Sequence, residues 1–283
     1  MLKTKSILAA LVLTATLATG AAVAQDDGHS TPHIEKQNWS FSGIFGTYDQ
    51  NQLQRGFQVF RESCANCHSA RLLAFRNLGE PGGPSFTEGQ VKALAAEYEV
   101  ADPTVDGGVR PAVPADRWPS PFANDQEARD ANGGSLPPDL SVMAKARGVV
   151  DPFPWWITNY FTGYSEGGPD YIHALLTGYH EEAPGDFELA EGKYYNEVFP
   201  GHAIGMAPPL FDEMIAYEPN EDGVTVPLTA EQYATDVSAF LMWMAEPHLV
   251  SRKETGFRVL LFLVLFAGLM WATKRRLWSG IEH

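Results

Sequence analysis

Cysteine is scarce in this sequence: Cys64 and Cys67 are the only two thiols among 283 residues. No further cysteine is available for a structural disulfide. A structural zinc site would need a second pair of closely spaced ligands, and the sequence has none. A thioredoxin-like redox pair would lie in a βαβ pattern, whereas glycine- and proline-rich segments follow this pair. The sequence therefore argues against a zinc site and against a disulfide oxidoreductase.

Basic residues are also few between positions 25 and 251. That stretch has 12 lysines and arginines against 33 aspartates and glutamates, a net charge of −21. Such a domain repels nucleic acid, so we expect no nucleic-acid partner. It attracts basic proteins over the ~8–10 Å Debye length of moderate salt. Solubility alone is the other explanation for so acidic a surface.

Long apolar runs are confined to the two ends of the chain. Residues 1–24 contain Lys3 and Lys5, an apolar stretch and Ala22-Val23-Ala24, which is the organisation of a cleaved secretory signal peptide. The run from Gly256 to Thr273 is apolar enough for a membrane-spanning helix, although it is at the short end of spanning lengths. A buried core helix is the alternative interpretation.

The residues around the second run orient the chain. Lys274-Arg275-Arg276 follow it directly, which favours a cytoplasmic C-terminus. The exported N-terminus requires the same orientation. We therefore expect a periplasmic domain over 25–252, a transmembrane anchor over 253–276 in the cytoplasmic (inner) membrane and a cytoplasmic tail over 277–283. The roughly 230 residues between the apolar ends suffice for one globular domain.

The segment Cys64-Ala65-Asn66-Cys67-His68 is a C-x-x-C-H motif. This spacing is the attachment signature of a c-type haem, in which both sulfurs bond to the porphyrin edge and the histidine ligates the iron. We therefore predict one haem c, attached covalently through Cys64 and Cys67 and ligated by His68.

The sixth iron ligand decides between an open and a closed haem. Met206 is the best candidate because it lies between Gly205 and Pro208-Pro209, in a loop that can present its sulfur closely. His202, four residues earlier, is the second candidate. Ligation by His68 and Met206 would close the iron and favour electron transfer, whereas an open iron would favour small-molecule binding.

Two capping signals predict the helices that frame the motif. Asp49-x-x-Gln52 starts an amphipathic helix that leads into Cys64, and Thr229-x-x-Gln232 starts a second one that ends before Pro247. In c-type cytochromes an N-terminal helix crosses a C-terminal one at a small residue, and Gly56 and Phe60 against Phe240 would fit. Two ordinary core helices would give the same pattern.

Loops are expected over much of the remainder, because glycine and proline make up 46 residues. Residues 101–140 are predicted to be mostly loop, followed by a helix over 141–150 with Asp139 or Ser141 as its N-cap and a short helix over 170–178. The predicted fold is therefore mainly α with long ordered loops: a class I-like c-type cytochrome domain plus one C-terminal transmembrane helix.

Several longer segments resemble the cytochrome c1 family, the haem subunits of the cytochrome bc1 complex. They are Arg55-Gly-Phe-Gln-Val-Phe60 before the haem motif, Leu136-Pro-Pro-Asp-Leu-Ser141, Asp170-Tyr-Ile-His-Ala-Leu-Leu-Thr-Gly-Tyr179, Phe199-Pro-Gly-His-Ala-Ile-Gly-Met-Ala-Pro-Pro209 and Ala245-Glu-Pro-His248 before the anchor. The resemblance covers nearly the whole mature chain, and the signal peptide indicates a bacterial member.

The resemblance also implies roles for individual residues. It makes Met206 the sixth ligand and suggests that Arg147 pairs with a haem propionate, for which a guanidinium offers two parallel donors. A solvated cation at a helix end is the alternative for Arg147. Asn132, Pro138 and Tyr171 would line the haem pocket.

The function implied by the resemblance is a relay of single electrons from a Rieske iron–sulfur protein to a soluble basic c-type cytochrome, without catalytic chemistry of its own. Cytochrome b, membrane lipid and a second copy of a dimeric complex are further expected partners. Docking of the soluble cytochrome could use either of two acidic clusters: Glu97, Glu99, Asp102 and Asp106, or Glu181, Glu182, Asp186 and Glu188. The rival interpretations are a peroxidase-like, membrane-anchored haem enzyme with an open iron and an assembly subunit whose haem is incidental.

Two features depart from the family pattern. Some bacterial members carry an extra cysteine pair that forms a disulfide, and this chain lacks it, so residues 160–200 depend on packing alone. Residues 148–170 look longer than in mitochondrial members, and a contact surface is the one role that we can suggest for them.

Overall fold

The computed structural model describes residues 34–148, 158–159, 166–185, 187–218 and 225–280. The predicted signal peptide over 1–24 and most of the 148–170 insertion lie outside these ranges.

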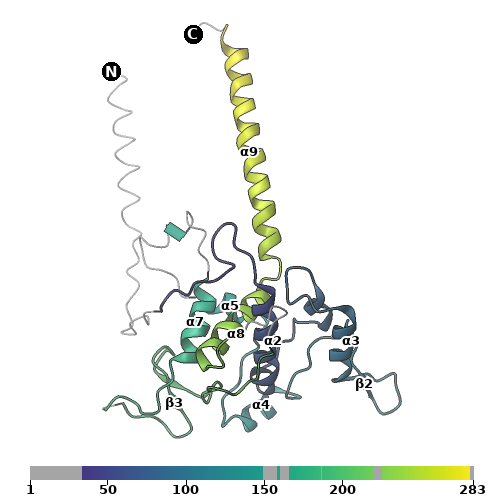
Figure 1. Ribbon diagram of the computed structural model, residues 1–283, viewed down its shortest axis with the longest axis vertical. Coiled ribbons are helices and arrows are strands. Elements are labelled where there is room, and N and C mark those ends of the chain that lie inside the picture. The colour runs from purple at the N-terminus through teal and green to yellow at the C-terminus, as the bar shows by residue number, and fades with distance from the viewer. Residues whose placement is uncertain (1–33, 149–157, 160–165, 186, 219–224, 281–283) are drawn as a thin grey trace, which may run out of the picture. The chain divides into compact units, whose positions relative to one another are not determined.

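The described part of the chain is mainly helical, as the sequence predicts (Figure 1). Its α-helices are α2 (Gln50–Glu62), α3 (Glu88–Ala96), α4 (Asp125–Ala131), α5 (Met143–Ala146), α7 (Gly167–Thr177), α8 (Ala230–Ala245) and α9 (Leu249–Trp278), and its 3-10 helices are η1 (Cys64–Asn66) and η2 (Phe75–Gly79). Two small antiparallel sheets pair β1 (Glu99–Ala101) with β2 (Val109–Pro111) and β3 (Tyr194–Tyr195) with β4 (Ala203–Ile204). Long segments without regular structure connect these elements.

The predicted crossing of an N-terminal and a C-terminal helix is present as the contact between α2 and α8. Both helices begin at the predicted caps: the Asp49 carboxylate accepts from the Gln52 amide at 2.8 Å, and the Thr229 hydroxyl accepts from the Gln232 amide at 3.3 Å. The rings of Phe60 and Phe240 lie 5.4 Å apart between the helices. Capping and aromatic packing therefore fix the helix that leads into the haem motif.

Gly56 is the closest point of this crossing. A Cβ atom at Gly56 would lie 2.1 Å from the Asp236 carbonyl oxygen and 2.7 Å from Phe240 Cβ. Beside it, Arg55 donates two hydrogen bonds of 2.9 Å to the carboxylate of Asp236, whose side chain is fully buried. Because a buried carboxylate needs such a partner, the ion pair and the glycine together hold the two helices in one register.

We expect Gly56→Ala to lower the free energy of unfolding by about 1–3 kcal/mol, because the new methyl group overlaps backbone that can move only if the helices separate. Gly89→Ala is the matched control: a Cβ in this helical position meets nothing within 4 Å, and alanine should stabilise α3 by ~0.5–1 kcal/mol. Thermal unfolding of the purified variants, followed by near-ultraviolet circular dichroism, measures both. Equal effects at the two positions would show that the crossing is not tightly packed.

The region 101–140 is less irregular than the sequence predicts. It takes part in the β1–β2 hairpin and contains α4, which begins at Asn124, whose side chain accepts from the amides of Gln126 and Glu127. The prediction missed α4 because its seven residues bury only Ala128 and so have no apolar stripe.

The C-terminal helix α9 runs for 30 residues without interruption (Figure 1). It is long and apolar enough to span a membrane, and none of its most apolar 18-residue window is buried against the described protein. Exposure of this whole apolar surface argues against the alternative of a buried core helix. The predicted anchor, residues 253–276, lies within α9.

Candidate haem site

The C-x-x-C-H segment begins directly after α2. The helix ends at Glu62, and the chain then tightens into η1, where the amides of Cys67 and His68 both donate to the Cys64 carbonyl at 3.2 and 2.9 Å. Cys64 is half-buried against the core and Cys67 is exposed. This turn holds the two sulfurs and the imidazole together at the end of a rigid helix.

His68 is oriented by a backbone acceptor. Its Nδ1 atom lies 2.8 Å from the Pro138 carbonyl oxygen, and because a carbonyl only accepts, Nδ1 carries the proton. Burial lowers the pKa of His68, which favours the neutral imidazole. A neutral ring with its proton on Nδ1 leaves the Nε2 lone pair available for a metal. Pro138 itself is exposed, so its contribution to the site is this carbonyl.

Asp139 and Ser141 hold the Pro138 segment against the chain that follows the motif. Asp139 accepts from the Ser69 hydroxyl at 2.8 Å and from the Arg71 amide at 2.9 Å, and the Ser141 hydroxyl accepts from the Leu72 amide at 3.0 Å. Burial alone would raise the pKa of Asp139, but these donors and Ser141 lower it, so the carboxylate is ionised.

The predicted N-cap role of Asp139 or Ser141 is therefore wrong. The helix α5 starts at Met143 after Val142, whose side chain caps nothing, and α5 is only four residues long. The physical reason is competition for these side chains: Asp139 Oδ2 and Ser141 Oγ accept from amides about 70 residues earlier in the chain, and Asp139 Oδ1 accepts from the Ser141 amide, which precedes the helix. Part of the predicted helix, residues 149–150, lies outside the described residues.

Met206 lies in the loop after β4 and is half-buried. The Tyr179 hydroxyl donates to the Met206 carbonyl at 3.1 Å, and the Ser63 hydroxyl donates to the Pro209 carbonyl at 3.0 Å. Ser63 directly precedes Cys64, so the loop of Met206 is tied to the end of α2. A Cβ at Gly205 would lie 2.2 Å from Ser135 Oγ, which explains why glycine precedes the methionine.

The second ligand candidate, His202, is engaged elsewhere. Its Nδ1 lies 3.2 Å from the Asn196 carbonyl, and its ring stacks on Tyr195 with centroids 5.7 Å apart. The Nδ1 contact alone would leave Nε2 available, as it does at His68, but the stacking on Tyr195 holds the imidazole against the β3–β4 hairpin and so favours Met206 as the ligand.

The other three predicted site residues lie on separate elements. Asn132 ends α4 and donates to the Ala128 carbonyl at 2.6 Å. Tyr171 is a largely buried residue of α7; burial raises the pKa of its hydroxyl, and the positive charge of Arg147 acts in the opposite direction. Arg147 is exposed at the end of α5 and forms no ion pair with the carboxylates of the described residues. Its guanidinium is therefore available for an anionic group.

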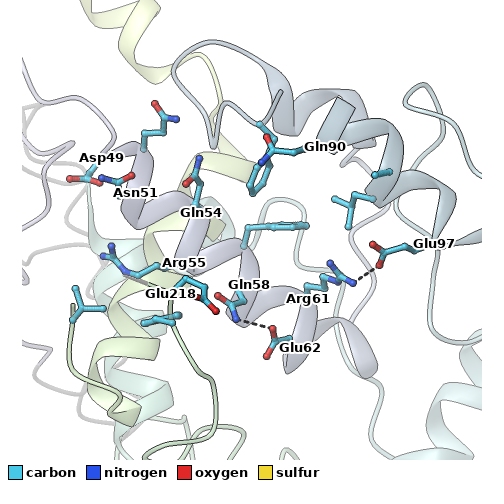
Figure 2. A pocket seen from close by; sticks show the side chains of 17 residues that line it. Asp49, Asn51, Gln54, Arg55, Gln58, Arg61, Glu62, Gln90, Glu97 and Glu218 are labelled. Atoms are coloured by element: carbon cyan, nitrogen blue, oxygen red, sulfur yellow. Dashed lines mark hydrogen bonds and ion pairs between the residues drawn. The ribbon is translucent and has the colours of Figure 1, made fainter. Parts of the chain in front are cut away.

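The donor set fits a c-type haem better than the alternatives. Burial raises the pKa of the Cys64 thiol to about 12, opposite to the low pKa of a redox-active cysteine pair. Within the described ranges, no group of three or more histidine, cysteine, aspartate or glutamate side chains could hold a metal ion. A groove of about 1020 Å3 is lined by α2, α3, Tyr217, Glu218 and Val226, and it includes none of the predicted site residues (Figure 2).

Sequence reasoning missed the residues that position the site: Ser63, Ser135, Tyr179 and Asn196, with Asp139 and Ser141 assigned the wrong role. Asn196 accepts from the amides of Val198 and Phe199 and donates to the Leu175 carbonyl, which shapes the chain before the Met206 loop. Ser63, Tyr179 and Ser135 carry no local signal because their partners are distant in the sequence, whereas the bonds of Asn196 to the amides of Val198 and Phe199 are a local asparagine turn.

A mainly helical domain that carries a C-x-x-C-H segment and ends in one long apolar helix has the organisation of a membrane-anchored c-type cytochrome. Comparison with known proteins narrows this class. The model of the cytochrome C1 family matches residues 39–281. Cytochrome c1 of Blastochloris viridis is 46% identical over 279 residues, which cover 97% of this chain and 96% of that protein. Cytochrome c1 of Rhodospirillum rubrum is 45% identical, with 93% of each chain covered.

The chain therefore belongs to the cytochrome c1 family. This confirms the predicted family, the fold class and the function as an electron-transfer subunit of the bc1 complex, and it implies a covalent haem c. The cytochrome b/c1 protein of Bradyrhizobium diazoefficiens is 48% identical over 279 residues, and the chain spans 40% of that longer protein.

Proposed function

We propose that this chain carries one haem c, bonded through Cys64 and Cys67 and ligated by His68 and Met206. In this proposal it passes single electrons from a Rieske iron–sulfur protein to a soluble basic c-type cytochrome. The observation that carries the proposal is the 2.8 Å contact between His68 Nδ1 and the Pro138 carbonyl. This contact fixes the tautomer and the ring direction that an iron ligand needs. Within the described residues, no hydrogen bond or ion pair occupies the other ring nitrogen, Nε2.

The residues of the chain would bind, orient and shield the group. Cys64 and Cys67 would retain it, His68, held by Pro138, would ligate the iron, and Met206 would supply the second ligand from a loop fixed by Tyr179. When bound, the iron supplies a reversible one-electron change, which methionine ligation shifts to higher potential. Arg147 is free to pair with a propionate, and Asn132 and Tyr171 complete the pocket. With His68 and Met206 both ligating it, the iron would have no site left for a substrate.

The membrane arrangement belongs to the same proposal. A signal peptide over 1–24 is removed, residues 25–252 form the periplasmic haem domain, 253–276 cross the inner membrane, and 277–283 remain cytoplasmic. Cytochrome b is the proposed membrane partner, in a dimeric complex. The name cytochrome b/c1 of the Bradyrhizobium relative, a protein much longer than this chain, supports that partner.

The relay is tested by rapid mixing of the assembled complex with ubiquinol in the presence of soluble cytochrome c. The absorbance of this chain's haem should show reduction before the soluble cytochrome is reduced, because the electron passes through it. Reduction of the soluble cytochrome at full rate while this haem stays oxidised would contradict the relay.

The two acidic clusters differ in how many of their carboxylates form ion pairs. In the first, Glu97 pairs with Arg61, and Asp102 pairs with Arg110 at 2.8 Å. In the second, Glu181, Glu182 and Glu188 are exposed and form no ion pair within the described residues. The second cluster also adjoins the Met206 loop, since the ring of Phe187 lies 6.3 Å from that of His202. We therefore assign docking of the basic cytochrome to the second cluster.

We expect the double variant Glu181→Gln, Glu182→Gln to slow electron transfer to the soluble cytochrome about two- to tenfold at low ionic strength, with a flatter salt dependence. Glu99→Gln, Asp106→Asn is the matched control, since it removes two exposed charges from the first cluster. Second-order rates over a salt series measure both. A larger effect of the control pair would move the docking site to the first cluster.

A further inference from the structure

A short loop lies between the start of the described chain and α2. Its base is packed against buried aromatic rings, and its tip is apolar and exposed. The base is aromatic: the rings of Trp39 and Phe41 stack at 5.4 Å, Phe41 meets Tyr48 at 5.0 Å, and both Trp39 and Phe41 are buried. The Thr47 amide donates to the Ser40 carbonyl at 3.1 Å and closes the loop. We call residues 40–47 the apolar loop.

The tip of the apolar loop projects two large hydrophobic side chains away from this base. Ile44 is 48% exposed and Phe45 is 75% exposed. Gly43 has a φ of 72°, and a Cβ at Gly46 would lie 2.1 Å from the Ser42 carbonyl, so the backbone that presents the tip is tightly constrained. A constrained loop that exposes an aromatic ring indicates a contact surface.

The apolar loop lies at the beginning of the membrane-length helix. The ring of Phe45 is 5.5 Å from that of Phe257 on α9, and Lys253 Nζ donates to the Phe41 carbonyl at 2.6 Å. Phe257 is the second residue of the apolar run from Gly256 to Thr273, whose 18 residues span ~27 Å as a helix, slightly less than the ~30 Å hydrocarbon layer. Phe45 is therefore held where the lipid-facing surface of α9 begins.

The charged side chains at the start of α9 favour contact with lipid more than those elsewhere on the domain do. The domain is strongly acidic, but the carboxylates of Glu254, in α9, and Glu246, just before it, are both paired: Arg258 with Glu254 at 3.2 Å, and Arg252 and Lys145 with Glu246, both at 2.6 Å. Lys253 adds a further cation beside the apolar loop. An anionic lipid surface is consequently not repelled here.

We propose that Ile44 and Phe45 insert into the phospholipid leaflet beside α9, as a second lipid contact of the domain. This inference rests on the proposed membrane insertion of α9. Two contacts fix the orientation of the haem domain relative to the membrane surface, whereas a single helix would allow it to tilt. The occupant is phospholipid because the tip continues the lipid-facing surface of α9.

Spin labelling of the full-length, haem-loaded chain in vesicles of phosphatidylcholine and phosphatidylglycerol tests the proposal. A nitroxide is placed through Phe45→Cys or, in case that variant folds poorly, Ile44→Cys. Val264→Cys on α9 is the lipid-exposed control, and Val113→Cys after β2 is the water-exposed control; both valines are exposed. Collision rates with oxygen, which concentrates in lipid, and with a water-soluble nickel chelate are then compared.

We expect the oxygen-to-nickel ratio at position 45 or 44 to be several-fold above that at position 113 and to approach that at position 264. A ratio equal to that at position 113 would overturn the proposal. The same label in the assembled complex should keep its high ratio. If neither oxygen nor the nickel chelate reached the label in the assembled complex, another protein would cover the tip, and this result would also overturn the proposal. The haem spectrum of the same samples tests the proposed function separately.

Discussion

Replacing Met206 with leucine is expected to lower the haem reduction potential on the order of hundreds of millivolts and to open the iron to carbon monoxide. Leucine keeps the volume and apolar character of the side chain but lacks the thioether sulfur. The hydrogen bonds that hold this loop, from Tyr179 and Ser63, end on backbone carbonyls and are unaffected by the change. The variant therefore removes the ligand without removing the loop. Redox titration and the carbon monoxide difference spectrum measure the two effects.

Met214→Leu is the matched control, because Met214 is a partly buried methionine packed against the core. It should leave both the potential and the carbon monoxide response unchanged. An enzyme with an open iron would instead bind carbon monoxide in the parent protein and change little in Met206→Leu. That outcome would favour the peroxidase-like interpretation.

The second large effect is expected from Cys64→Ser, Cys67→Ser. Without either thiol no thioether can form, so denatured protein should release all of its haem, and ubiquinol turnover by the complex should fall to background. Haem retained on the denaturing gel and turnover with soluble cytochrome c provide the measurements. Cys64 also contacts the core, but serine at both positions keeps the side-chain size nearly constant.

Ala65→Ser is the control for this double variant, because it changes the same turn without touching an attachment residue. It should keep covalent haem and normal turnover. Normal turnover in the double cysteine variant would contradict the relay and would support the reading of an assembly subunit with an incidental haem.

The parts of the fold that follow from local chemistry could be predicted from the sequence. Caps at Asp49 and Thr229, together with apolar side chains at helical spacing, give α2 and α8, and the need for a small residue at their crossing identifies Gly56. The long apolar run likewise gives α9. Each of these signals lies within a few residues of the element it determines.

The parts that depend on distant partners could not be predicted. Asp139 looks like a helix cap in sequence, but its Oδ2 accepts from Ser69 and Arg71, which lie next to the haem motif, and its Oδ1 accepts from the Ser141 amide, which precedes α5. The helix α3 is not among the predicted helices although its start has a local signal, the capping box of Thr87 and Gln90. Tyr179, like Asp139, depends on a distant partner, because its hydrogen bond to the Met206 carbonyl is formed only in the folded chain.

A pyridine haemochrome assay combined with a carbon monoxide difference spectrum, on protein extracted from membranes, tests the central claim most directly. One haem c per chain that survives denaturation, with a reduced form that does not take up carbon monoxide, is the predicted result. Colourless protein, or a reduced iron that binds carbon monoxide readily, would contradict a haem bonded through Cys64 and Cys67 and closed by His68 and Met206.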